Sequence, residues 1–154
     1  MTTIEEVSSR LEDIQSKAAA RAVSGRLSYR GAVTPEEAWT LVEEGRARLL
    51  DVRSSAEWVL VGRVPGAVEI ELKHFPSWQP NSGFLAEVRR HFAADEHIVI
   101  LCRSAVRSHD AATLLTDNGY ANCYNILEGF EGDKNPDAQR VVAGWKVRGL
   151  PWSH

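Results

Sequence analysis

The sequence predicts an α/β fold in which a mostly parallel sheet carries helices on both of its faces. Short apolar segments typical of buried strands alternate along the chain with segments of helical periodicity. The spacers between these strands are long enough to hold a helix, which favours parallel pairing with right-handed crossovers. With 154 residues, 44% of them hydrophobic, the chain fits one globular domain and an N-terminal extension.

Charge and cysteine content exclude several classes of protein. The net charge of -3 and the pI near 6.0 give no electrostatic footprint for nucleic acid, and no run of Lys or Arg suggests an anionic membrane. Cys102 and Cys123 cannot build a disulfide framework, and no apolar run reaches about 18 residues. The acidic N-terminus argues against a cleaved targeting segment. We therefore expect a cytoplasmic protein that binds neither nucleic acid nor membranes.

Residues 1–27 are predicted to form a helical extension to the domain, which is expected over residues 28–154. Apolar residues recur three and four positions apart, as in an amphipathic helix, at Ile4, Val7, Leu11, Ile14 and Ala18. Only about two heptads are present, too few for a coiled coil. We expect this helix, which would end near Ala22, to pack on the chain's own domain, and a homodimer formed through it stays open as the alternative.

The next two helices are predicted from their N-terminal signals. Thr34-Pro35-Glu36-Glu37 supplies an N-cap threonine, a proline at the first helical position and a capping-box glutamate, and Gly45 ends that helix. Residues 49–52 are then predicted to form a short buried strand. Either Ser54 or Ser55 caps a brief helix after it.

The middle of the chain predicts a second strand and a loop near the site. Pro65-Gly66 makes a turn into a strand over residues 67–70. A segment rich in Pro and Ser follows, and it is expected to be a loop that could flank an active site. A helix is expected around residues 85–92, where the apolar residues again have helical spacing.

The remaining elements place Cys102 at a strand end. Residues 98–101 predict a very apolar and therefore central strand, and residues 102–108, CRSAVRS, lead into a helix that stops at Asn118-Gly119. Residues 123–127 are predicted to form another strand. In open α/β sheets ligands bind at the carboxyl ends of the strands, which is where Cys102 stands.

Cys102 is expected to carry a reactive thiolate. A strand that ends at a cysteine and turns into a helix aims backbone N–H groups and the positive helix end at the sulfur. Arg103 and Arg107 add positive charge nearby. Without the loop, the same cysteine would be interpreted as a small buried hydrophobe. For the two arginines, a role in binding the substrate and a role as solvated charges or salt-bridge partners both stay open.

The chain resembles the rhodanese family of sulfurtransferases, from about Ser28 to the C-terminus. Several separated motifs carry the resemblance in order: Asp51-Val52-Arg53 with Glu57-Trp58, Gly62-Arg63-Val64-Pro65-Gly66-Ala67, the CRSAVRS loop, the segment 124–132, and Gly144-Trp145 with Gly149-Leu150-Pro151-Trp152. The resemblance implies a three-layer fold with a central five-stranded sheet.

The resemblance also implies the chemistry of the site. It identifies Cys102 as the residue that forms a persulfide, and the loop that cradles the sulfur corresponds to Arg103, Ser104, Ala105, Val106 and Arg107, with Ser108 entering the helix. Many relatives have glycine where Ala105 stands, and its Cβ disfavours a positive φ in a tight loop. No metal or cofactor is required.

The implied function is transfer of a sulfane sulfur from a small anionic donor, such as thiosulfate or a persulfide, to cyanide, a thiol or a protein acceptor. Phosphatases and arsenate reductases of the same fold hold a loop one residue longer, because a tetrahedral oxyanion needs a wider ring of donors than one sulfur atom. A non-enzymatic binding or sulfur-relay module is the other alternative.

Other polar, cysteine and aromatic residues receive structural interpretations. Asp51, Arg53 and Glu57 are expected to form a buried ion-pair network that braces the strand end rather than an acid/base set. Cys123 is expected to pack in a strand. Three aromatic residues near turns are left outside the site: Phe75, Trp78 and Phe130.

Overall fold

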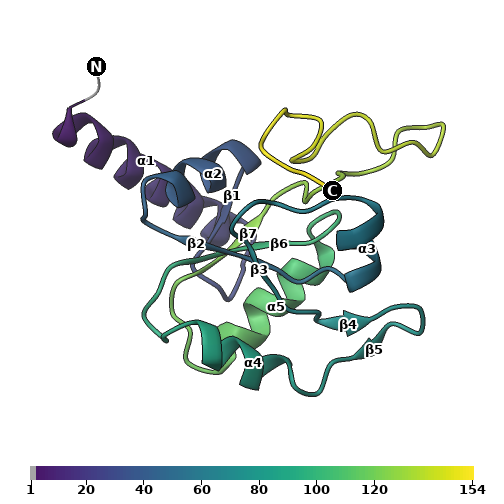
Figure 1. Cartoon of the computed structure of the whole chain (residues 1–154). Coiled ribbons are helices and arrows are strands. Elements are labelled where there is room, and N and C mark those ends of the chain that lie inside the picture. Colours follow the sequence, from purple (N-terminus) through teal and green to yellow (C-terminus); the bar gives the residue numbers. More distant parts are fainter. Residues whose placement is uncertain (1–2) are drawn as a thin grey trace.

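The computed structural model describes residues 3–154, with five helices and seven strands in that part of the chain. The helices are α1 (Ile4–Ser24), α2 (Pro35–Glu43), α3 (Ser55–Leu60), α4 (Phe84–His91) and α5 (Val106–Asp117). The strands are β1 (Gly31–Val33), β2 (Arg48–Asp51), β3 (Val68–Glu69), β4 (Lys73–His74), β5 (Gln79–Pro80), β6 (Ile98–Leu101) and β7 (Cys123–Ile126). Figure 1 shows their arrangement.

Five of the strands form one parallel sheet in the order β1-β7-β6-β2-β3. The predicted central strand is confirmed, because β6 lies in the middle of this order and all four of its residues are buried. Alternate β6 side chains enter two separate apolar clusters: Ile98 and Ile100 on one face, Val99 and Leu101 on the other. The sheet is therefore covered on both faces.

Helices form the two outer layers of the fold. α4 and α5 supply Phe84, Val88 and Leu115 to the cluster around Ile100, and α1 and α2 supply Ile14 and Leu41 to the cluster on the opposite face. In Figure 1, α1 and α2 accordingly lie above the sheet and α4 and α5 below it. The predicted α/β fold with helices on both faces is confirmed.

The N-terminal helix packs on the chain's own sheet, as predicted. Leu11, Ile14 and Ala18 of α1 are buried in the same cluster as the sheet residues. Gly31 of β1 lies so close that a Cβ there would be 2.8 Å from the Cβ of Ala18. Arg21 adds an ion pair to Glu37 of α2 at 2.6 Å.

The predicted helix starts are also confirmed. Thr34 accepts from the Glu37 amide while the Glu37 carboxylate accepts from the Thr34 amide, and Ser54 and Glu57 form the same reciprocal pair at α3. Pro35 occupies the first turn of α2, where its missing N–H costs nothing.

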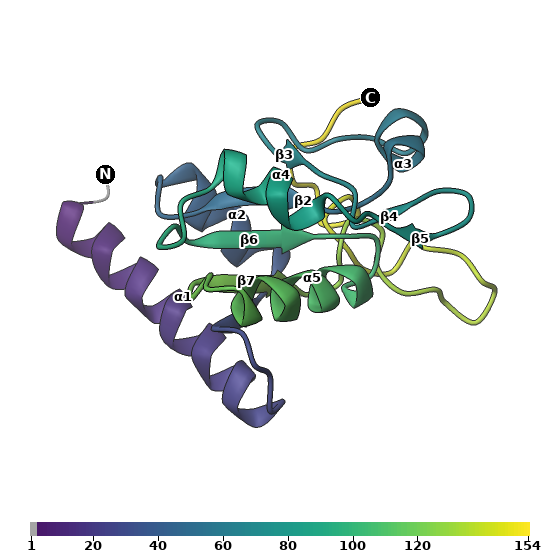
Figure 2. The same ribbon diagram turned by 90° about the horizontal axis from the view of Figure 1, so that it is seen from below.

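Two parts of the sheet architecture were not predicted. β1 is only three residues long, and it becomes a strand by pairing with β7 rather than through a pattern of its own. The segment predicted as a loop after residue 70 contains the antiparallel hairpin β4–β5. Figure 2 shows this hairpin beyond the carboxyl end of β6, on the side where α5 begins.

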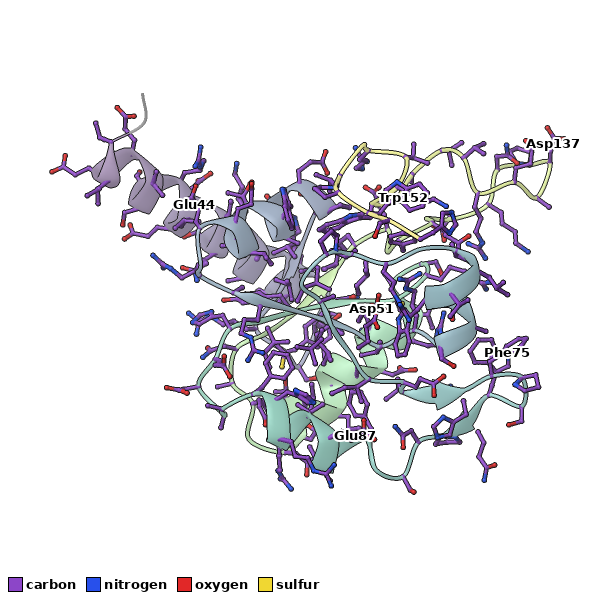
Figure 3. All side chains as sticks on the ribbon, viewed as in Figure 1. Glu44, Asp51, Phe75, Glu87, Asp137 and Trp152 are labelled. Atoms are coloured by element: carbon purple, nitrogen blue, oxygen red, sulfur yellow. The ribbon has the colours of Figure 1, made fainter. Side chains whose placement is uncertain are left out.

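A buried ion pair braces the end of β2, as predicted for Asp51 and Arg53, whereas Glu57, which was predicted in the same network, pairs with Arg107 instead. Both side chains are fully buried, with Arg53 Nη2 2.7 Å and Nε 3.0 Å from the two carboxylate oxygens. Arg53 also donates to the Gly62 carbonyl at 2.8 Å, and its guanidinium lies 4.2 Å from the centre of the Phe130 ring. Figure 3 shows Asp51 in the interior of the molecule. The pair ties β2 to the segments after α3 and β7.

Among residues 3–154, no helix has both the length and the continuous apolar character that crossing a bilayer demands.

Removing one partner of the Asp51–Arg53 pair should strongly destabilise the fold. Arg53→Met leaves the Asp51 carboxylate buried without its counter-charge, so we expect a loss of about 3–5 kcal/mol in the free energy of unfolding. Urea titration followed by circular dichroism measures this loss. Lys17→Ala, which breaks the exposed pair to Asp13, is the control and should change stability by less than about 0.5 kcal/mol. A loss as small as the control's would contradict the bracing role.

Candidate active site

Cys102 directly follows β6 and reaches a cavity despite its burial. Only 1% of the residue is exposed, because its backbone and most of its side chain lie in the apolar cluster against α5. Its exposed edge borders a cavity of about 350 Å³. The other lining residues are Lys73, Trp78, Arg103, Ser104, Val106 and Arg107. A small reagent can therefore reach the sulfur from one direction.

The loop after Cys102 offers a run of uncommitted backbone donors. Within residues 3–154, the N–H groups of residues 103–108 find no main-chain or side-chain acceptor. The first two carbonyls of the same loop are occupied: Cys102 accepts from the Phe130 amide at 2.8 Å, and Arg103 accepts from the amides of Glu131 and Gly132 at 3.0 and 3.1 Å. Successive free N–H groups form a concave site suited to an anion.

The positive end of α5 lies at this loop. Val106 is the first residue of the helix, and its N-cap, Ala105, supplies no side-chain hydrogen bond to the first turn. The free N–H groups of that turn carry the positive end of the helix dipole. Ala105 has φ +78°, so the loop does require the left-handed backbone conformation that a Cβ disfavours.

Gly129 allows the chain after β7 to approach the loop. It has φ +69°, and a Cβ on it would lie 2.5 Å from the carbonyl carbon of Arg103 and 2.6 Å from the Ser104 nitrogen. Such distances are shorter than any real carbon contact, so a side chain there would displace the loop.

The two loop arginines have different environments. Arg107 makes a bidentate ion pair with Glu57 of α3, at 2.6 and 2.9 Å, and both side chains are largely buried. Burial opposes both charges, but their mutual hydrogen bonds lower the pKa of Glu57 and raise the pKa of Arg107. Arg107 is therefore a salt-bridge partner, whereas Arg103 is exposed and, among the described residues, pairs with no carboxylate.

The match to a known family accounts for this arrangement. A model of the rhodanese-like domain matches residues 34–135, which include β2, β6, the Cys102 loop and β7. The chain belongs to the rhodanese-like domain family.

Three similar proteins illustrate the range of this family. The RP600 homolog of Rickettsia rickettsii, described as uncharacterised, is 41% identical over 114 residues, covering 73% of this chain and 87% of that protein. The thiosulfate sulfurtransferase GlpE of Actinobacillus succinogenes is 29% identical over 119 residues, covering 77% and 86%. The crystal structure of Rv0390 from M. tuberculosis has a TM-score of 0.73 at 38% identity, and the match covers 80% of this chain and 97% of that one.

Behind Cys102, the rhodanese-like domain contains a buried polar network that the sequence did not predict. The Cys102 Sγ lies 3.2 Å from the Ser108 hydroxyl, which donates to Oδ1 of Asn125 at 2.5 Å. The amide nitrogen of Asn125 donates to the Ala105 carbonyl at 3.2 Å and approaches the Tyr29 hydroxyl at 3.4 Å. Asn125 is a β7 residue, and its only signal in the sequence was a polar side chain within an apolar strand.

The hairpin contributes an aromatic wall to the site of the rhodanese-like domain. Trp78 lines the cavity, and its ring centre lies 5.0 Å from the Arg107 guanidinium. The prediction that left Trp78 outside the site is therefore wrong, while Phe130 is a fully buried core residue, as expected. Phe75 packs edge-on against Trp78 and remains 55% exposed, and Figure 3 shows it on the hairpin.

Cys123 has no part in the cavity. It is fully buried in β7, and burial raises the pKa of its thiol to about 12. This environment fits the predicted packing role, because a thiol that stays protonated at neutral pH is unreactive. Within residues 3–154, no three side chains of His, Cys, Asp or Glu gather as a metal site.

Replacing Ala105 by glycine should stabilise the protein. The Cβ of Ala105 opposes its positive φ, so Ala105→Gly is expected to raise the free energy of unfolding by about 1 kcal/mol. Urea titration measures whether the free energy of unfolding rises or falls. The matched control is Ala20→Gly in the exposed interior of α1, which should lose about 1 kcal/mol. A destabilised Ala105→Gly variant would show that the loop is not strained at this position.

Proposed function

We propose that this protein is a sulfurtransferase that carries a sulfane sulfur as a persulfide on Cys102. The observation that supports this most directly is the set of free N–H groups of residues 103–108 next to a cysteine at a cavity wall. A relative named thiosulfate sulfurtransferase supports the same chemistry.

The proposed reaction has two displacement steps. The Cys102 thiolate attacks the outer sulfur of thiosulfate, a new S–S bond forms, and the old S–S bond breaks with its electron pair leaving on sulfite. Cyanide or a thiolate then attacks the outer sulfur of the Cys102 persulfide. Thiocyanate or a new persulfide is released, and the electron pair returns to Cys102. Both steps move one sulfur atom between nucleophiles, so neither an added base nor an electron acceptor is needed.

The loop residues have distinct proposed roles. The backbone N–H groups of residues 103–108 stabilise the negative outer sulfur, together with the N-terminus of α5. The cationic side chains of Arg103 and Lys73 line the cavity, and no ion pair within residues 3–154 engages them, so they attract the anionic donor. Arg107 contributes its amide, and its side chain holds the loop against α3 through Glu57.

The proposed place of action is the cytoplasm, since a reducing compartment keeps Cys102 available as a thiol. The acceptor class stays open between cyanide, a small thiol and a protein thiol. A non-enzymatic binding module is the alternative. It would differ from the proposed enzyme in showing no turnover of thiosulfate and cyanide.

Loading with thiosulfate should add one sulfur atom to Cys102. Intact-protein and peptide mass spectrometry locates the adduct, and Cys102→Ser should abolish both the adduct and thiocyanate production from cyanide. Cys123→Ser is the matched control and should keep both, because that thiol is fully buried. An undiminished rate in Cys102→Ser, or an adduct confined to Cys123, would refute the proposed function.

The two uncommitted cations should set the affinity for the donor. Arg103→Met and Lys73→Met are each expected to raise KM for thiosulfate by about three- to fivefold, less so at high salt, because exposed charges at the cavity contribute up to about 1 kcal/mol. Steady-state kinetics at two ionic strengths measure this. Arg90→Met, at an exposed arginine of α4, is the control. Unchanged KM values in both cavity variants would remove the proposed steering role.

A further inference from the structure

The buried side chains of Ser108 and Asn125 lie directly behind the reactive sulfur, and neither side chain has a part in the two displacement steps. Ser108 is fully buried and Asn125 is 5% exposed. The Ser108 oxygen lies 3.2 Å from Cys102 Sγ and 2.5 Å from the side-chain oxygen of Asn125. Ser108 has one hydroxyl proton, so it can donate a well-aligned hydrogen bond to only one of these two neighbours.

The orientation of the Asn125 amide follows from its other contacts. Its nitrogen faces the Ala105 carbonyl at 3.2 Å, and the reversed amide would place two oxygens at that distance with no hydrogen between them. The 2.5 Å separation from Ser108 fits an O–H···O bond and is too short for N–H···O. Oδ1 therefore faces Ser108, and because an amide oxygen cannot donate, the Ser108 proton lies between the two residues.

Tyr29 and His109 hold the other end of this amide. The second amide hydrogen of Asn125 points to the Tyr29 oxygen at 3.4 Å, and Tyr29 lies 2.8 Å from Nδ1 of His109. Burial raises the pKa of Tyr29, so it stays a neutral phenol that can donate to His109. Contacts of both the oxygen and the nitrogen of the Asn125 amide thus fix its orientation.

We propose that Asn125 holds the Ser108 proton and makes Ser108 a positioning residue that faces Cys102 with its lone pairs. In this arrangement Ser108 accepts from the S–H of the thiol and disfavours the bare thiolate. What this arrangement would achieve rests on the proposed function. In a persulfide the negative charge moves to the outer sulfur, so the lone pairs of Ser108 no longer face a charged atom. The pair would then favour the loaded cysteine over the empty thiolate.

The surrounding charges do not depend on this hydroxyl. The charged and titratable groups near Cys102 are the pairs Arg107–Glu57 and Asp51–Arg53, the cavity cations Lys73 and Arg103, and the Tyr29–His109 contact. Only Tyr29 belongs to the network, and it contacts Asn125 rather than Ser108. Substitution of Ser108 therefore leaves these charges in place.

Ser108→Ala tests the sign of the interaction. We expect Cys102 alkylation by iodoacetamide at about pH 6.5 to become roughly three- to tenfold faster, because the variant removes the acceptor that favours the thiol. Peptide mass spectrometry quantifies the modified Cys102. Thr113→Ala, which removes an exposed hydroxyl from the same helix, is the control and should keep the wild-type rate. A slower or unchanged rate in Ser108→Ala would show that the hydroxyl does not act as an acceptor, and would overturn the proposal.

A double-mutant cycle tests the part played by Asn125. In Asn125→Leu the Ser108 proton is released and can turn to the sulfur, so adding Ser108→Ala should now slow alkylation instead of accelerating it. Acceleration in both backgrounds would overturn the role of Asn125. If Asn125→Leu does not fold, as judged by circular dichroism, Asn125→Val provides a smaller substitution that also lacks an acceptor, and the same reversal is required.

The alkylation readout requires no sulfur transfer, so it separates this inference from the proposed function. If the wild-type protein never forms a persulfide, the proposed sulfur transfer is refuted. The alkylation result still decides the direction of the hydrogen bond between Cys102 and Ser108. Where the persulfide forms, Ser108→Ala should lower the loaded fraction at least about twofold at a fixed ratio of thiosulfate to sulfite. A loaded fraction equal to that of the wild type would refute the stated purpose of the pair.

Discussion

The hydrogen bonds that residues 130–132 donate to the carbonyls of Cys102 and Arg103 determine the shape of the site. They are 2.8–3.1 Å long and engage the first two carbonyls of the loop, while the following N–H groups find no acceptor among residues 3–154. Gly129 makes the approach possible, because any side chain there would overlap the Arg103 carbonyl. A segment nearly thirty residues away in the sequence thus fixes the conformation of the loop that starts at Cys102.

Neutral dipoles suit this position better than a buried ion pair. Cys102 is almost fully buried, and an ammonium or guanidinium placed against its sulfur would itself lose hydration, which costs several kcal/mol per ion. Backbone N–H groups are already part of the folded loop and need no such desolvation at the moment of reaction. Arg107 of α5 is paired with Glu57, whereas Arg103 and Lys73 stand at the cavity wall without an ion pair among residues 3–154.

The sequence predicted features that depend on nearby residues. The capping box and first-turn proline of α2 act within four residues, and the apolar run of β6 is enough to make it central. β1 could not be predicted in this way, because its three residues become a strand through pairing with β7. The same holds within the site: Glu57 reaches Arg107 across 50 positions, and Asn125 meets Ser108 only because β7 lies beside β6. Distant contacts of this kind leave no local pattern.

Ala105 connects the shape of the loop to the chemistry of its sulfur. Its left-handed conformation directs its carbonyl to two donors, the His109 amide at 3.3 Å and the Asn125 side chain at 3.2 Å. These bonds offset part of the cost of the Cβ in that conformation, which is about 1–2 kcal/mol for a residue other than glycine. They also fix the amide of Asn125, and through it the direction of the Ser108 proton. The energetically unfavourable backbone conformation of Ala105 therefore orients the Asn125 amide, and this amide in turn directs the lone pairs of Ser108 toward Cys102.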